Sequence, residues 1–130
     1  MAEVSVGKKA LWTGRVLTAI PILMMLMSAT FKLVGGAQME KDWTRFGYPM
    51  GTLVPIGVTE VACALLLAIP RTSILGAVLV TGYLGGAVAT HARMLDPAFP
   101  SPAILGAMAW LGLYLRDPRV RALLPLRRDP

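Results

Sequence analysis

The residues of this sequence best suited to chemistry are Lys32, Glu60, Tyr83 and His91, all of which lie in long apolar stretches. Placing an ionisable side chain inside a membrane costs free energy, so such a residue is expected to have a polar partner and a function. A carboxyl group and an imidazole can both change protonation in an apolar site. We therefore predict a ligand-binding cluster of Lys32, Glu60, Tyr83 and His91, with Glu60 and His91 as the candidate catalytic acid and base.

Three of these residues also have a purely structural interpretation. The long stem of Lys32 could carry its ammonium group outward to the membrane surface. Glu60 could make a fixed hydrogen bond between helices, and His91 could lie at the end of a helix near the interface. The sequence leaves these alternatives open.

Metal chemistry has too few ligands in this chain. There is one histidine, His91, and one cysteine, Cys63. Neither a closed zinc site nor bis-histidine haem ligation can be built from them within one chain. We predict no metal site, and the residues themselves make no cofactor evident.

Long apolar blocks must position these side chains. Hydrophobic residues make up 55% of the chain and charged residues 15%, with a mean hydropathy of +0.63. Blocks of this length can cross about 30 Å of hydrocarbon as helices. We predict one all-α domain over residues 1–130, an integral membrane four-helix bundle with up-down-up-down topology. The helices are expected at about 10–34, 51–69, 72–95 and 102–115, and a basic cytoplasmic tail at 116–130.

The net charge of +6 comes from basic residues at the ends of the apolar blocks. They form no stripe with exposed aromatic residues, so a lipid bilayer is the predicted partner and nucleic acid is not. Basic residues concentrate on the cytoplasmic side of membrane proteins. One side of the predicted bundle holds nine: Lys8, Lys9, Arg15, Arg71, Arg116, Arg119, Arg121, Arg127 and Arg128. The other holds three: Lys41, Arg45 and Arg93. We therefore predict a multi-pass protein with both termini in the cytoplasm.

Small residues recur in the third predicted helix, where Gly82 and Gly86 have GxxxG spacing. Such spacing lets helix backbones approach closely, either within a bundle or between subunits of a homo-oligomer. We expect Gly86 at a close helix–helix contact. Trp12 and Trp43 are expected to be interfacial anchors, whereas Trp110 should pack inside the bundle.

Several stretches, in this order and spacing, resemble the DoxX-like family of small bacterial four-helix membrane proteins. They are residues 28–33 (SATFKL), 46–49 (FGYP), 57–60 (GVTE), 66–72 (LLAIPRT), 83–93 (YLGGAVATHAR) and 110–117 (WLGLYLRD). The resemblance implies the cytoplasmic (inner) membrane of a bacterium. It also implies an association with quinone or thiol chemistry, because the family is named after a subunit of a membrane thiosulfate:quinone oxidoreductase and has relatives in redox-stress complexes.

Three functions remain open at this point. The first is a non-catalytic membrane subunit or a binder of a small lipid-soluble ligand such as a quinone, associated with membrane or redox partner proteins. The second is a membrane enzyme that uses Glu60 and His91 on a lipid-soluble substrate. The third is a small proton-coupled exporter, which we favour least because four-helix exporters place their essential carboxylate in the first helix.

Overall fold

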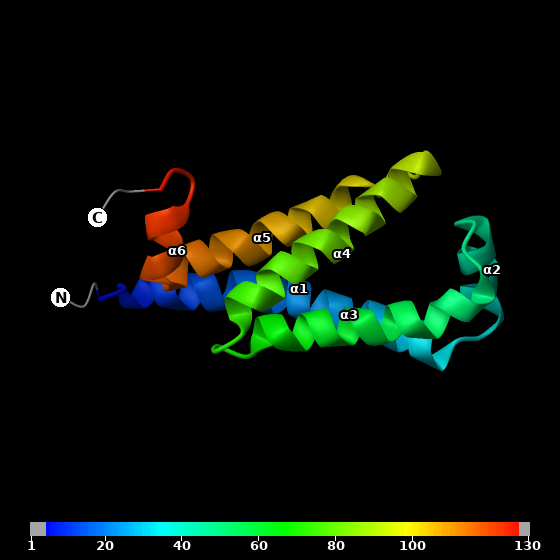
Figure 1. Ribbon diagram of the computed structural model, residues 1–130, viewed down its shortest axis with the longest axis horizontal. Coiled ribbons are helices and arrows are strands. Elements are labelled where there is room, and N and C mark those ends of the chain that lie inside the picture. The colour runs from blue at the N-terminus through cyan, green and yellow to red at the C-terminus, as the bar shows by residue number, and fades with distance from the viewer. Residues whose placement is uncertain (1–4, 128–130) are drawn as a thin grey trace.

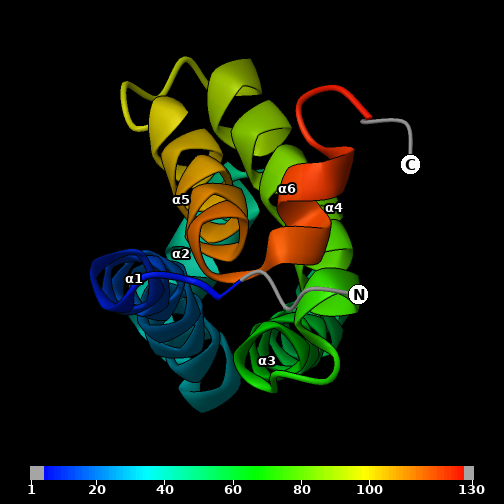
Figure 2. The ribbon, with the colours of Figure 1, turned by 90° about the vertical axis from the view of Figure 1, so that its left-hand side faces the viewer.

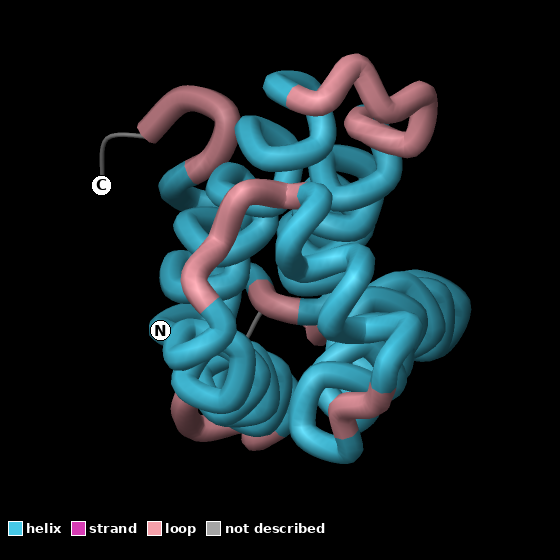
Figure 3. The backbone as a smooth tube through the Cα atoms, turned by 90° about the vertical axis from the view of Figure 1, so that its right-hand side faces the viewer, coloured by secondary structure: helices cyan, strands magenta, loops and turns pink. Residues whose placement is uncertain are grey.

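A computed structural model describes residues 5–127, and these residues form helices and connecting loops without a strand (Figure 3). The all-α prediction is therefore confirmed. The helices are α1 (Lys8–Val34), α2 (Ala37–Arg45), the 3-10 helix η1 (Met50–Thr52), α3 (Leu53–Ala68), α4 (Ser73–Arg93), α5 (Pro100–Arg116) and α6 (Pro118–Leu123).

The four long helices α1, α3, α4 and α5 pack side by side. Contacts join α1 to α3, α3 to α4, α4 to α5 and α5 back to α1, so these helices surround a common centre (Figure 2). Each long helix runs opposite to the one before it, with α2 at one end of the assembly and α6 at the other (Figure 1). The core between them holds Met25, Leu67, Val80, Ala109 and Leu113.

Three helical segments are long and apolar enough to cross a membrane: α1, Met50–Ala68 and α4. Large apolar side chains also cover their outer faces, among them Leu23, Val58 and Val78, each more than half exposed. Exposed apolar surface of this extent suits a lipid environment. Helix α5 is apolar too, but with 17 residues it is shorter than each of these three segments.

Two short helices were not predicted. Helix α2 occupies the loop after α1, and α6 occupies part of the tail that follows α5. Asp117 caps α6 by accepting a hydrogen bond from the backbone N–H of Arg119, and Pro118 fills the first helical position.

In α2, Trp43 is only 5% exposed and donates from Nε1 to Thr52 Oγ1 at 3.1 Å. The expectation that Trp43 is an interfacial anchor is therefore wrong.

Glycine permits the closest helix contacts at the α6 end of the bundle. Gly14 of α1 faces Gly112 of α5, and a Cβ added at Gly112 would lie 2.6 Å from Thr18 Cγ2 and 2.7 Å from the Gly14 carbonyl oxygen. Gly76 of α4 lies against the backbone of Leu67, where an added Cβ would overlap it. These backbones can approach so closely because no side chain separates them.

The glycines in the middle of α4 do not make such contacts. A Cβ added at Gly82, Gly85 or Gly86 would meet nothing within 4 Å. The expected close contact at Gly86 is therefore wrong, because GxxxG spacing identifies a helix face but not what that face meets. From the hairpin at residues 69–72, α4 diverges from α3 toward the α2 end (Figure 1).

We predict that Gly112→Ala destabilises the bundle by about 1–3 kcal/mol, because the new methyl group overpacks the α1–α5 crossing. Thermal unfolding of the purified protein in one fixed detergent measures the effect. Gly85→Ala is the matched control, since it adds the same methyl group to open space and gains helix propensity. Equal melting temperatures for the two variants would contradict the assigned crossing.

Candidate functional site

A cavity of about 570 Å³ lies between the long helices in the half of the bundle nearer α2. Most of its lining is apolar and includes Met24, Met25, Ile56, Leu84 and Leu105. All four sequence-predicted site residues, Lys32, Glu60, Tyr83 and His91, also line it. Their assignment as ligand-binding residues stays a prediction, but the fold does bring them to one cavity.

Lys32 and Glu60 form a direct ion pair across α1 and α3. The Nζ atom of Lys32 donates to Glu60 Oε2 at 2.8 Å and to Ser28 Oγ at 2.6 Å. The side chains are 13% and 4% exposed. A buried carboxylate needs a compensating charge, and the ammonium group supplies it with a charge-assisted hydrogen bond. Lys32 therefore turns inward and does not reach out to the membrane surface.

Gly57 explains why this pair can form. It lies one helical turn before Glu60 on α3, and a Cβ added there would lie 3.1 Å from Leu33 and 3.2 Å from Lys32. The missing side chain lets the last turn of α1 approach α3 closely. The approach brings the lysine within hydrogen-bond reach of the carboxylate.

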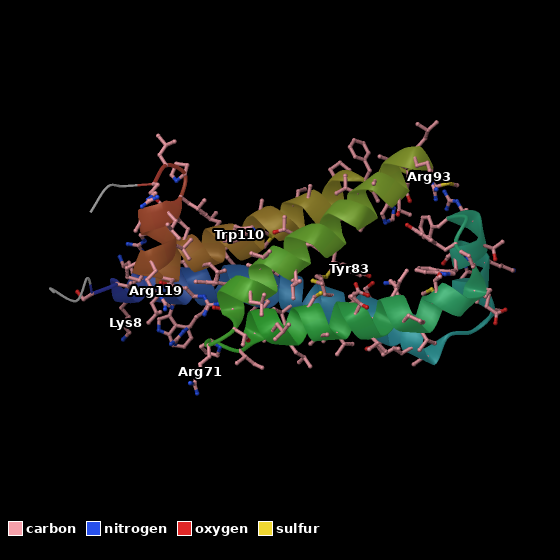
Figure 4. The ribbon with its side chains drawn as sticks, viewed as in Figure 1. Lys8, Arg71, Tyr83, Arg93, Trp110 and Arg119 are labelled. Atoms are coloured by element: carbon pink, nitrogen blue, oxygen red, sulfur yellow. The ribbon has the colours of Figure 1, made fainter. Side chains whose placement is uncertain are left out.

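Tyr83 enters the cavity from α4, in the middle of the bundle (Figure 4). It packs against the apolar core as well as lining the cavity. Its phenol adds a group that can both donate and accept a hydrogen bond beside the ion pair.

His91 does not pair with Glu60 but with Asp96, beyond the end of α4. Its Nδ1 lies 3.0 Å from Asp96 Oδ2, and its ring packs edge-on against Phe46 at a centroid distance of 5.2 Å. The chain turns back here because Leu95 has a φ of 54°, in the left-handed region. The backbone N–H of Ala98 and the His91 ring hold the pKa of Asp96 below its ordinary value. The two candidate catalytic residues thus have separate partners.

Aromatic residues that sequence reasoning missed close the α2 end of the cavity. Tyr48 is hydrogen-bonded to Thr90 Oγ1 at 2.6 Å and stacks on Trp43 at 5.0 Å. Arg93 donates to the Phe46 carbonyl oxygen and lies over the Tyr48 ring. Trp43, Phe46, Tyr48 and Thr90 all line the cavity. Their signal was the aromatic cluster at residues 43–48, which an extended loop would have left exposed.

Exposed lining residues show where the cavity opens to the surface, and they include Met24 of α1, Ser101 of α5 and one group on α3 and α4. Thr59, Gly82 and Gly86 line it and are themselves exposed. Gly82 lies nine residues after the start of α4, so the opening is about 13 Å along the helix axis, near its middle. The absence of side chains at the two glycines keeps this opening wide.

Metal binding has no support in the part of the chain that the structure describes. Residues 5–127 contain no group of three His, Cys, Asp or Glu side chains close enough to hold an ion. Cys63 is a free, buried thiol in the core.

Comparison with known proteins identifies the family of this chain. The model of the DoxX-like family matches residues 16–112, which is about three quarters of the chain, so the chain belongs to the DoxX-like family. The matched range contains Lys32, Glu60, Tyr83 and His91. No curated protein and no solved structure was found to match the chain.

We predict that Lys32→Met lowers the free energy of unfolding by about 3 kcal/mol, because it leaves the Glu60 carboxylate buried without its cation. The double variant Lys32→Met/Glu60→Gln should recover much of this loss, since both charges are then removed. The coupling energy follows from the free energies of unfolding, in one detergent, of the parent, Lys32→Met, Glu60→Gln and the double variant. Lys41→Met, on the exposed face of α2, is the control. Additive effects of the two substitutions would contradict the pair.

Proposed function

We propose that this member of the DoxX-like family spans the bacterial cytoplasmic membrane four times and binds a small lipid-soluble ligand in the cavity beside Lys32 and Glu60. A quinone is the candidate ligand. The protein would act as a non-catalytic membrane subunit that presents this ligand to redox partner proteins.

Helix α5 supplies the fourth crossing in this proposal. Its 17 residues extend for about 25 Å, close to the thickness of the hydrocarbon layer. It packs against α1 and α4, two helices able to span a membrane. These contacts support the proposal that α5 lies in the bilayer with them, as the fourth helix of an up-down-up-down bundle.

The distribution of basic residues supports cytoplasmic termini. Lys8, Arg71 and Arg119 lie at the α6 end of the bundle, whereas Arg93 lies at the α2 end (Figure 4). The α6 end is the richer in lysine and arginine, so it faces the cytoplasm under the positive-inside rule. The cavity then lies in the outer half of the membrane.

The opening at Gly82 and Gly86 is the observation that carries the proposed ligand class. In the proposed topology it lies at the depth of the hydrocarbon layer, and aromatic residues close the α2 end of the same cavity. A largely apolar cavity with a few convergent polar groups is typical of a small-molecule site. A ligand that enters from the bilayer has to be lipid-soluble.

A quinone fits the polar groups in the cavity. The Lys32 ammonium uses two of its three N–H donors on Glu60 and Ser28, so one remains for a carbonyl oxygen. The Tyr83 hydroxyl provides a second donor in the same cavity. A carbonyl at each side of a flat ring would match two such donors.

A subunit that binds its ligand is favoured over an enzyme with a Glu60–His91 acid–base pair. Glu60 accepts from Lys32 and His91 is held by Asp96, so each candidate catalytic group already has its own partner. An acid and a base that serve one reaction need to reach the same substrate atoms. Holding and orienting a ligand needs no such convergence.

We predict that a short-chain ubiquinone quenches the fluorescence of Trp43, which lines the cavity. The variant Trp12→Phe/Trp110→Phe leaves Trp43 as the one tryptophan, since the chain has three. In this background Gly86→Phe should weaken binding at least tenfold, about 1.4 kcal/mol, because its ring fills the opening.

Gly85→Phe is the matched control for the binding experiment. It adds the same ring one residue away, at an exposed position that does not line the cavity. Its affinity should equal that of the parent. Failure of ubiquinone to quench Trp43, together with purified protein that carries no lipid-soluble compound by mass spectrometry, would refute the proposed ligand class.

Topology has its own test. Cys63→Ala gives a cysteine-free background, because Cys63 is the one cysteine of the chain. In intact spheroplasts, a membrane-impermeant maleimide should label Lys41→Cys on α2 and leave Arg71→Cys unlabelled until the cells are lysed. The reverse pattern would place the α6 end outside the cell.

A further inference from the structure

Charged side chains at the α6 end of the bundle are unevenly paired. Asp117 is the one carboxylate among residues 5–127 at this end. It is engaged by Arg119, whose Nε donates to Oδ1 at 3.1 Å and whose terminal nitrogen donates to Oδ2 at 2.9 Å. Asp117 also attracts Arg116, and no other described carboxylate lies at this end to balance the remaining basic residues.

Arg121 has a structural explanation. Its guanidinium donates to the backbone carbonyl oxygens of Tyr114, at 2.7 Å, and Leu115. These carbonyls belong to the last turn of α5, where the helix leaves them without partners. Arg121 therefore caps α5.

Arg15 and Arg116 have no such explanation. The Nε of Arg116 is buried, and within residues 5–127 it is the one buried side-chain polar atom without a hydrogen-bond partner. Arg15 is exposed, and its guanidinium lies 5.0 Å from the centre of the Trp12 ring. A buried donor without an acceptor is unfavourable, and the described residues supply no acceptor for Arg116 Nε.

The α1–α5 crossing holds these two arginines together. A Cβ added at Gly14 would lie 3.1 Å from Arg116 Cβ, and Arg15 is the next residue along α1. The two positive charges are near enough to repel each other. An anion bound between the two guanidinium groups would remove this repulsion.

We propose that Arg15 and Arg116 bind the phosphate group of an anionic phospholipid in the cytoplasmic leaflet. Two guanidinium groups match phosphate oxygens because each presents a planar fork of N–H donors. Trp12 is 55% exposed, as is typical of a tryptophan at the level of the lipid headgroups. This site lies at the opposite end of the bundle from the cavity and does not depend on the ligand proposed there.

The surface next to Trp12 suits the acyl chains of such a lipid. An exposed apolar stripe continues along α1 with helical spacing through Val16, Ile20, Leu23 and Met27. A phospholipid whose phosphate lies at Arg15 and Arg116 can therefore lay its tails along α1. Arg15 connects the two, because on α1 it lies between this exposed stripe and the Gly14 face that meets α5.

Native mass spectrometry of the full chain in detergent tests the site, with phosphatidylglycerol, phosphatidylcholine and inorganic phosphate as separate probes. We expect phosphatidylglycerol to be retained at least fivefold more than phosphatidylcholine. Arg15→Gln/Arg116→Gln should abolish this preference. Lys8→Gln/Lys9→Gln removes the same charge from the same end and should keep it.

The controls separate a built site from general electrostatics. Equal loss of the preference in both double variants would overturn the proposal, since net charge would then explain the binding. Inorganic phosphate bound as tightly as phosphatidylglycerol would overturn the lipid assignment. If Arg116→Gln does not fold, Arg15→Gln alone, at an exposed position, should still reduce phosphatidylglycerol retention severalfold. An unchanged retention in that variant would also overturn the site.

Discussion

A carboxylate at Glu60 can lie inside this bundle because the Lys32 ammonium lies 2.8 Å from it. An ionised carboxylate deep in an apolar site is strongly unfavourable on its own, so the pair fixes how α1 and α3 are placed along each other. Gly57 makes the required approach possible, and Ser28 gives the ammonium a second acceptor. The polar half of the cavity is built on this contact.

The rest of the bundle divides into a close-packed end and an open end. Near α6, Gly14, Gly76 and Gly112 let the helix backbones touch. Toward α2 the helices diverge, and the space between them becomes the cavity (Figure 1). The same residue type therefore has opposite uses, because glycines at a crossing close the bundle whereas Gly82 and Gly86 leave it open.

Much of this architecture can be read from the sequence, and the limits have physical causes. The all-helical class follows from apolar runs long enough to span hydrocarbon, and the inward turn of Lys32 agrees with the need of a deep Glu60 for a cation. The partner of His91 could not be read, because it depends on the left-handed turn at Leu95 that returns Asp96 to the ring. Gly86 was misplaced because spacing along one helix does not say which neighbour its face meets. Helix α2 was missed because a short amphipathic segment is stabilised by the burial of Trp43, a tertiary contact.

Because the cavity opens at α3 and α4, the ligand concentration that matters for this protein is the concentration in the membrane. Under the proposed function, a ligand enters the cavity past Gly82 and Gly86 from the bilayer, so its occupancy would follow its mole fraction among the lipids and not its amount in water. An apolar compound is enriched in the membrane by partitioning, and even a weak intrinsic affinity then fills the cavity. Any apparent dissociation constant measured in micelles should consequently rise in proportion to the detergent that dilutes the ligand.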